Sequence, residues 1–297
     1  MDERIRILTD TLLDEIVNAV GLRRTPAARR TFSLFFRKAA RRLAEIGAAT
    51  DRLVRTDGLP AACQWMMSHW VRGVETRGAE NIPPEGPLLV VSNHVGAYDI
   101  LVVPSQINRP DLKIIASDIP YLMNLPAVSE HLIFLTEDGV DRWTAARAGI
   151  RQLQADGSLL LFGTGKIDPD PDFSPEAEKH IEGWSPSIDL FLRRAPQAKV
   201  VIAIASGFLT QHWLQHPLTH LRRVDWERRR LAQFGQVIQQ LFQPGSLYVS
   251  PHVSFAPPVS ADELRRESGS ERVLPAVIAR GKALLAEHLA AFRTQPV

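Results

Sequence analysis

The segment PLLVVSNHVGAYDILVV, residues 87–103, holds two apolar runs separated by a polar turn. The first run, residues 88–91, follows the turn NIPPEGP of residues 81–87, whose prolines fix φ and remove backbone donors. It therefore predicts a short buried strand. Residues 100–106 show helical spacing instead. A strand that passes at once into a helix indicates an α/β fold.

The alternation of strand and helix continues through the rest of the chain. Further strands are expected at residues 112–116, 132–135, 158–162, 199–205 and 247–255. Helical patterns are found at residues 141–155, 186–194 and 271–292. The sequence thus predicts an open, largely parallel central sheet flanked by helices, with functional residues on the loops that leave the strand ends.

The first quarter of the chain differs from the remainder. Its apolar residues recur at helical spacing and predict helices at about residues 2–20, 26–46 and 59–71. The pattern changes at Arg72. We therefore expect an N-terminal amphipathic helical segment, residues 1–73, followed by one α/β domain, residues 74–297.

Composition indicates an ordinary globular protein, because 45% of the 297 residues are apolar and 23% are charged. The single cysteine, Cys63, excludes an internal disulfide and a cysteine-based zinc site. No apolar run approaches the roughly 20 residues of a membrane-spanning helix, and the first residues lack the pattern of a secretory signal. We therefore expect a cytoplasmic protein.

Basic residues are distributed unevenly, although the net charge is only +2. Residues 21–44 contain eight Lys or Arg, several aromatic residues and no acidic residue, and five arginines lie within residues 222–230. Such segments favour peripheral binding to an anionic membrane surface. The alternative is a pair of solvated helix faces that pack their apolar sides on the domain. Nucleic acid is not expected as a partner, because no zinc-finger spacing, RNA-recognition signature or polybasic tail is present.

The block SNHVGAYD, residues 92–99, carries the chemistry. His94 and Asp99 are separated by four residues, so a turn into a helix near Gly96 would bring the carboxylate onto the imidazole. His94 could then act as a general base on a hydroxyl or amine that attacks a thioester. We expect Gly96 to leave room for the substrate and Asn93 to hold the turn or polarise the site. A structural histidine is the alternative.

Together with GAENIP, residues 78–83, this block resembles the opening of the glycerolipid acyltransferase superfamily, which includes the lysophosphatidic acid acyltransferases. The resemblance extends over about residues 74–255. It implies that His94 is the catalytic base and Asp99 its partner. It also implies transfer of a fatty acyl group from acyl-CoA or acyl carrier protein to a lipid acceptor, with neither a covalent acyl-enzyme nor a cofactor.

A glycine-rich turn follows the expected strand 158–162 and departs from the family. The family has Phe-Pro-Glu-Gly-Thr and a basic residue here, whereas this chain continues after Phe162 with Gly163, Thr164, Gly165 and Lys166. The backbone N–H groups of such a turn and a lysine ammonium can bind an anion. We expect these four residues to line the acceptor site. A tight turn with a solvated lysine is the alternative.

A second departure concerns the phosphate of the acceptor. Thr136 stands where the family has an arginine, and Arg142 and Arg147 are expected on the exposed face of the next helix. Because the base is kept while the phosphate-binding residues are changed, lysophosphatidic acid is expected to be a poor acceptor. A hydrolase that uses the same His94 and Asp99, or a lipid-binding protein without activity, are the alternative functions.

No metal site is expected. The histidines at 212, 216 and 220 recur at helical spacing, but Pro217 interrupts that helix. The aspartates at 168, 170 and 172 alternate with prolines, which favours an extended, solvated loop over a cation site.

Overall fold

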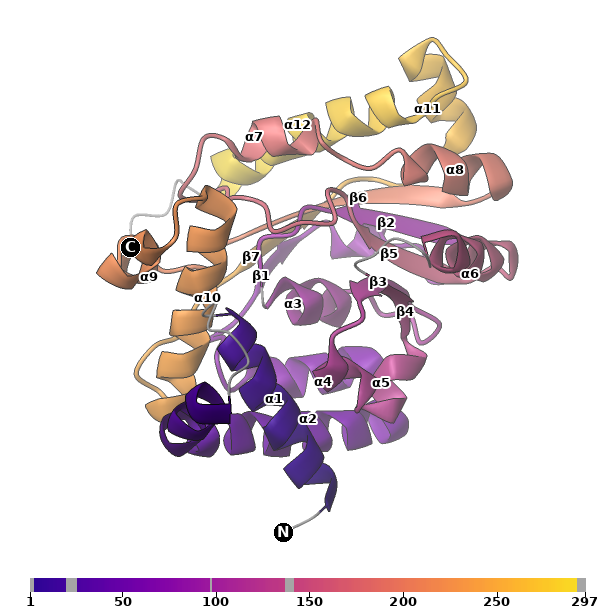
Figure 1. Ribbon diagram of the computed structural model, residues 1–297. Helices are drawn as coiled ribbons and strands as arrows, with labels where there is room; N and C mark the ends of the chain where they lie inside the picture. Colours follow the sequence, from indigo (N-terminus) through magenta and orange to yellow (C-terminus); the bar gives the residue numbers. More distant parts are fainter. Residues whose placement is uncertain (1–2, 20–25, 97, 137–141, 293–297) are drawn as a thin grey trace.

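The computed structural model describes residues 3–19, 26–96, 98–136 and 142–292, and its centre is an eight-stranded sheet (Figure 1). The strand order is β1 (Glu75–Arg77), β7 (His252–Phe255), β6 (Lys199–Ser206), β2 (Leu88–Ser92), β5 (Ser158–Phe162), β3 (Lys113–Ser117) and β4 (Leu132–Leu135). The short β8 (Val259–Ser260) pairs with the beginning of β6. Among the described strands, only the pairings of β6 with β7 and β8 are antiparallel. The expected open, largely parallel sheet is confirmed.

Helices cover both faces of the sheet, which explains why its central strands are apolar throughout. In β2, Leu88 and Val90 enter one core, and Leu89 and Val91 enter another. Each such side chain contributes about 1.5–3 kcal/mol by leaving water. The first core packs under α3 (Asp99–Gln106). The second packs under α6 (Arg142–Gln154), α7 (Ala177–Ile181), α8 (Ser187–Arg194), α11 (Ala261–Ser268) and α12 (Leu274–Phe292).

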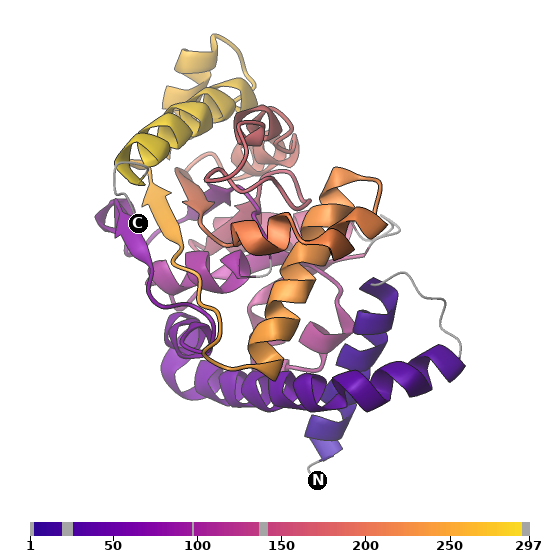
Figure 2. The ribbon, with the colours of Figure 1, turned by 90° about the vertical axis from the view of Figure 1, so that its left-hand side faces the viewer.

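The N-terminal helices form outer layers beyond α3. The long α2 (Pro26–Met67) packs on α3, and α1 (Glu3–Ala19) packs on α2. The short α4 (Pro120–Met123) contacts α1, and α5 (Pro126–Glu130) contacts α2. Figure 2 shows α10 (Asp225–Phe242) crossing from the level of α2 toward the sheet. The remaining short helices are α9 (Gln211–Leu214) and the 3₁₀ turns Ala79–Asn81 and Pro217–Leu221.

Several elements differ from the expectation. Residues 26–67 form two helices that meet at a kink at Gly58, where φ is 83°, so the first helix continues beyond its expected end at residue 46. The strand expected at residues 247–255 begins only at His252. The helix α10 was not expected. Met67 and Trp70 share a core with β2, so the helical segment is packed into the same body as the sheet, and the division at residue 73 stays a prediction.

Within the described residues, every helix is too short or too polar to span a lipid bilayer.

Candidate active site

The site lies at the carboxyl ends of β2, β5 and β6, which meet because these strands are parallel. Asn93, the first residue after β2, is buried and makes two hydrogen bonds with the backbone of Ala205 in β6. Its Nδ2 donates to the carbonyl, and its Oδ1 accepts from the N–H, both at 2.8 Å. Asn93 therefore anchors the loop that carries His94, as the turn-holding hypothesis for this residue expects.

His94 and Asp99 form a hydrogen-bonded pair. The imidazole Nδ1 lies 2.8 Å from Asp99 Oδ2, which also accepts from the Gly96 N–H at 2.9 Å. Asp99 is the first residue of α3, where the helix dipole favours a carboxylate. Its side chain is fully buried, whereas that of His94 is 27% exposed. Because a carboxylate can only accept, Nδ1 carries the proton and Nε2 is left as the basic nitrogen.

The surroundings of His94 tune its basicity. Burial by itself would lower the pKa of the imidazole, but the charge and hydrogen bond of Asp99, together with the charge of Asp168, raise the pKa above its ordinary value. The ring also packs on Phe162, with 4.6 Å between the ring centroids. The imidazole is thus oriented and basic, with one edge accessible.

Asp168 makes two hydrogen bonds with the backbone of His94. Its Oδ2 accepts from the His94 N–H at 2.9 Å, and its own N–H donates to the His94 carbonyl. Its Oδ1 accepts from the Thr164 hydroxyl at 2.9 Å and lies 3.3 Å from His180 Nδ1. Burial raises the pKa of Asp168, and these partners oppose that shift. Asp168 is therefore a positioning residue for the loop.

Asp170 likewise anchors the loop after β6 by accepting hydrogen bonds from its backbone. Its carboxylate accepts from the N–H groups of Gly207 at 3.0 Å, Phe208 at 2.8 Å and Leu209 at 3.3 Å. Burial, together with the charge of Asp172, raises the pKa of Asp170 to about 6.

The expectation of a solvated loop at residues 168–172 is wrong, because the side chains of Asp168 and Asp170 are buried, with only 3% and 2% of each residue exposed. The physical reason is that their carboxylates satisfy backbone donors of two neighbouring loops.

The glycine-rich turn, residues 163–166, packs against the rest of the site. Gly163 donates to the Ser92 carbonyl at 2.7 Å, and a Cβ there would lie 2.4 Å from the Trp184 ring. Gly165 has a φ of 64°, and the side chain of Lys166 is exposed. Only Thr164 joins the His94 network, through Asp168. The role of this turn in acceptor binding stays a prediction.

Gly96 makes room for a helix. Its φ is 153°, and a Cβ at this position would lie 1.9 Å from the amide of Gln233 in α10. Gln233 donates to the Val95 carbonyl, so α10 closes directly onto the His94 loop. The space that Gly96 was expected to leave for the substrate is therefore filled by the side chain of Gln233.

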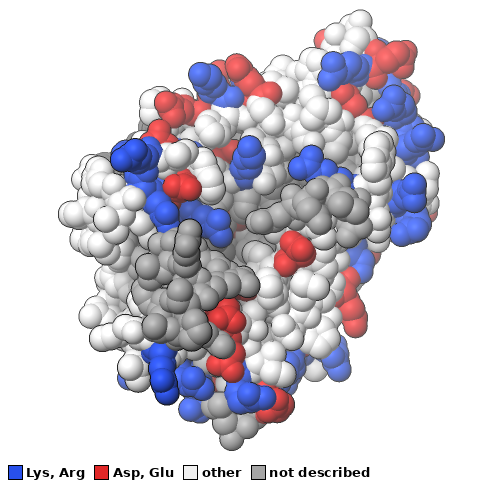
Figure 3. All heavy atoms as spheres, viewed as in Figure 1, with Lys and Arg blue, Asp and Glu red and all other residues white. Residues whose placement is uncertain are grey.

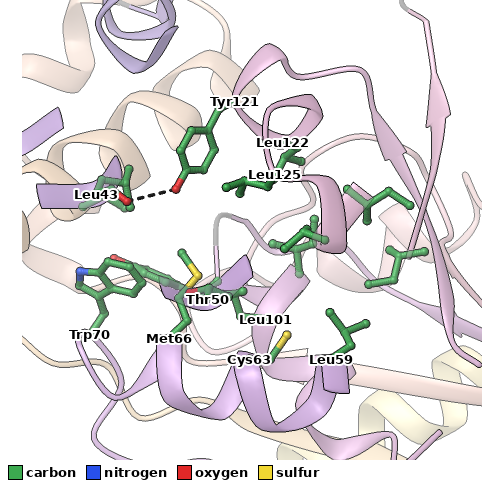
Figure 4. Close-up of a pocket in the computed structure, with 16 residues that line it drawn as sticks. Leu43, Thr50, Leu59, Cys63, Met66, Trp70, Leu101, Tyr121, Leu122 and Leu125 are labelled. Carbon is green, nitrogen blue, oxygen red and sulfur yellow. Dashed lines mark hydrogen bonds between the residues drawn. The ribbon is translucent and has the colours of Figure 1, made fainter. Parts of the chain in front are cut away.

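An apolar cavity of about 210 Å³ lies between α2, α3, α4, α5 and the strands β3 and β4 (Figure 4). Tyr98 and Ile100, which flank Asp99 in the chain, form part of its wall. None of the described residues that line it is charged. Cys63 belongs to the wall, and burial raises the pKa of its thiol to about 12, so it stays protonated. The cavity suits a hydrocarbon chain.

Arg142 and Arg147 are exposed on α6, as the sequence predicted. Residues 137–141, which follow Thr136, lie outside the described residues. In the part of the chain that the structure describes, no group of three or more His, Cys, Asp or Glu side chains is arranged to hold a metal ion.

The sequence matches no protein-family model and no curated protein. Among solved structures, it is similar to the crystal structure of the 1-acyl-sn-glycerophosphate (LPA) acyltransferase PlsC from Thermotoga maritima, with 15% sequence identity and a TM-score of 0.44. The similarity covers 98% of this chain and 99% of that one.

Proposed function

We propose that the protein is an acyltransferase that moves a fatty acyl group from acyl-CoA or acyl carrier protein to a lipid acceptor. The observation that carries the proposal is the hydrogen bond of 2.8 Å between His94 and the buried Asp99, whose two neighbours in the chain, Tyr98 and Ile100, line an apolar cavity. In this proposal, His94 is a base of raised pKa and the cavity is the binding site for the hydrocarbon chain.

In the proposed reaction, Nε2 of His94 removes the proton from the acceptor hydroxyl as its oxygen attacks the thioester carbonyl. The tetrahedral intermediate then collapses, the carbon–sulfur bond breaks, and the imidazolium returns the proton to the leaving thiolate. Asp99 stabilises the imidazolium in between and holds the ring in one orientation. No covalent acyl-enzyme is needed.

We test this proposal with an isotopically labelled long-chain acyl-CoA, a total lipid extract and the purified chain. The expected result is a labelled lipid ester or amide, which mass spectrometry identifies together with its acceptor. If label appears only as free fatty acid, the hydrolase alternative is correct instead.

The apolar cavity is proposed to hold the acyl chain. Val128 lines it, and Val128→Phe would place a ring where the chain lies. Losing the burial of two methylene groups, at about 0.8 kcal/mol each, should lower kcat/KM roughly tenfold for a long donor while a short donor is spared. The measurement is a series of acyl-CoA donors of increasing length. Ile7→Phe, on the outer helix α1, is the control. A chain-length profile that is identical in the two variants would exclude the cavity as the acyl site.

Peripheral membrane binding is proposed for α2. Leu34 and Phe35 are 81% and 69% exposed, and exposed Arg37, Lys38 and Arg41 lie close to them in the helix. Two of these cations have acidic partners, Asp10 at 4.0 Å from Arg37 and Glu45 at 2.8 Å from Arg41, so the surface is moderately rather than strongly basic. The basic residues Arg23 and Arg24 lie outside the described residues.

We expect the chain to bind vesicles of anionic phospholipid, and binding should weaken as salt rises, because screening shortens the reach of the basic side chains. Replacing both Leu34 and Phe35 by Ser should weaken binding further, whereas Trp143→Ser, at an exposed position on α6, should not. Co-sedimentation at two salt concentrations measures this. Equal binding to zwitterionic vesicles, or none at all, would exclude an anionic surface as the partner.

A further inference from the structure

A second cavity, of about 300 Å³, lies between the loop after β5 and the start of α10. Unlike the apolar cavity, its lining combines apolar residues with polar and charged ones, among them Asp170, Ser174, Gln211, Arg228 and Arg229. Lys and Arg side chains lie around the upper end of α10 in Figure 3, with single acidic side chains among them. The mechanism above uses none of these basic groups.

The position of this cavity follows from the buried polar face of α10. Gln233 bonds the Val95 carbonyl next to His94, and Gln236 bonds the Phe208 carbonyl at 2.8 Å. Gln240 bonds the Leu247 carbonyl at 2.9 Å. Arg229 precedes Gln233 by four residues and so lies on the same face, about 6 Å further along the axis. The face that closes on the catalytic loop therefore continues into Arg229.

Arg229 differs from the glutamines in one respect. Its Nε is buried, and within the described residues no hydrogen bond satisfies it and no carboxylate lies within ion-pair distance of the guanidinium. Burial lowers the pKa of Arg229, while the charges of Asp225 and Asp168 oppose the shift. A buried guanidinium donor without a partner is unfavourable by itself, and an anionic ligand would satisfy it.

The acidic groups in the same cavity do not supply that ligand. Both oxygens of Asp170 are occupied by the backbone N–H groups of the 207–209 loop. Asp225 is largely exposed and lies 3.8 Å from Arg228, whose Nε donates to the Arg222 carbonyl. Both arginines line the cavity, and a planar guanidinium can bind phosphate oxygens through paired N–H groups.

We infer that this cavity binds a phosphate group of one of the two substrates, with Arg229 as its principal ligand and Arg228 as a second. The inference rests on the proposed acyl transfer, since either a donor that carries phosphates or a phosphorylated lipid acceptor would bring such a group close to His94. Arg229 is then a substrate-binding residue that sets specificity, on the same helix whose Gln233 contacts the loop that carries the base.

Binding is measured first, because it needs no turnover. Calorimetric titration of the native chain with inorganic pyrophosphate, and separately with CoA, is compared with that of Arg229→Gln, Arg229→Lys and the control Arg266→Gln, at an exposed position on α11. We expect at least one of the two probes to bind, with roughly ten- to hundredfold weaker affinity in Arg229→Gln. The loss should be smaller in Arg229→Lys, which keeps the charge but not the planar fork, and absent in the control.

Equal affinity in the native chain and Arg229→Gln, or equal losses in Arg229→Gln and the control, would overturn the inference, as would no binding of either probe by the native chain. Arg229 is partly buried and makes no ion pair within the described residues, so we expect Arg229→Gln to fold, and its thermal unfolding is recorded alongside. If it does not fold, Arg229→Lys carries the comparison.

Kinetics then distinguish the source of the phosphate. If the donor carries it, Arg229→Gln lowers kcat/KM for acyl-CoA but not for an acyl thioester of N-acetylcysteamine, which has no phosphate. If the acceptor carries it, the variant lowers kcat/KM for lysophosphatidic acid but not for monoacylglycerol, and the expectation that lysophosphatidic acid is a poor acceptor is wrong. A uniform loss for all four substrates would contradict a phosphate site. If the native chain binds pyrophosphate but transfers no acyl group, the proposed function is refuted, whereas the inference of a phosphate-binding site stands.

Discussion

His94→Ala is expected to abolish acyl transfer, with a loss of at least about 10²- to 10⁴-fold in turnover, because the variant lacks the nitrogen that accepts the proton. The measurement is the initial rate of labelled lipid formation at saturating donor. The substitution also leaves the buried carboxylate of Asp99 with the Gly96 N–H as its remaining hydrogen bond in the described structure, so the free energy of unfolding should fall as well.

Two further variants separate catalysis from folding. His94→Gln can keep a hydrogen bond to Asp99 but cannot act as a base near neutral pH, so it should be as inactive as His94→Ala while regaining stability. His220→Ala, at an exposed position, should retain full activity. Substantial transfer by either His94 variant would remove the imidazole from the mechanism.

Asp99→Asn is expected to have the second largest effect, a fall in turnover of up to about 10⁴-fold, the size seen when the carboxylate of a serine-protease triad becomes an amide. The amide nitrogen can donate toward the imidazole, which favours the tautomer with the proton on the wrong nitrogen. Asp262→Asn, on the exposed side of α11, should leave turnover unchanged. Wild-type turnover in Asp99→Asn would show that the carboxylate is structural.

The pH profile of kcat/KM supplies the second readout for Asp99. The base must be neutral, so activity falls as pH decreases through the pKa of His94, which the native site raises. Without the carboxylate, burial still lowers the pKa of His94 and the main opposing effect is gone. The acidic limb of the profile should therefore move to lower pH in Asp99→Asn. A limb that does not move would show that another group titrates.

The central pair could be predicted from the sequence because its geometry is local. His94 and Asp99 lie on one strand–turn–helix unit, and the apolar run of residues 88–91 fixes where that unit begins. The largely parallel sheet with helices on both faces follows from the same alternation of short apolar runs and helical patterns, whereas the order of its strands does not.

The supports of the pair could not be predicted in the same way. The bond from His94 to Asp168 spans 74 residues, and that from Gly207 to Asp170 spans 37. A sequence of alternating aspartate and proline gives no sign of which distant backbone groups the carboxylates will meet. The sequence alone therefore favours a solvated loop, whereas in the structure contacts with distant backbone groups bury the two aspartates.

The helix α10 was missed for a related reason. Its buried positions include Gln233, Gln236 and Gln240 besides Ala232 and Leu241, and these glutamines weaken the apolar helical spacing of Leu231, Phe234, Ile238 and Leu241. The signal that could have found it is a run of helix-forming residues that begins with Asp225 and Glu227, where acidic side chains favour a helix start. Its Arg229 was therefore interpreted as part of a membrane-facing cluster, whereas its Nε is buried next to a cavity.

The most direct test of the central claim is the ratio of thiol released to acyl lipid formed by the native chain with acyl-CoA and a lipid acceptor. Thiol is followed by a colour reagent and the lipid by its label, in one reaction. An acyltransferase that uses His94 on the acceptor predicts a ratio close to one, and it predicts that both signals disappear together in His94→Ala. A large excess of thiol over acyl lipid, or release of thiol that survives in His94→Ala, would contradict the account.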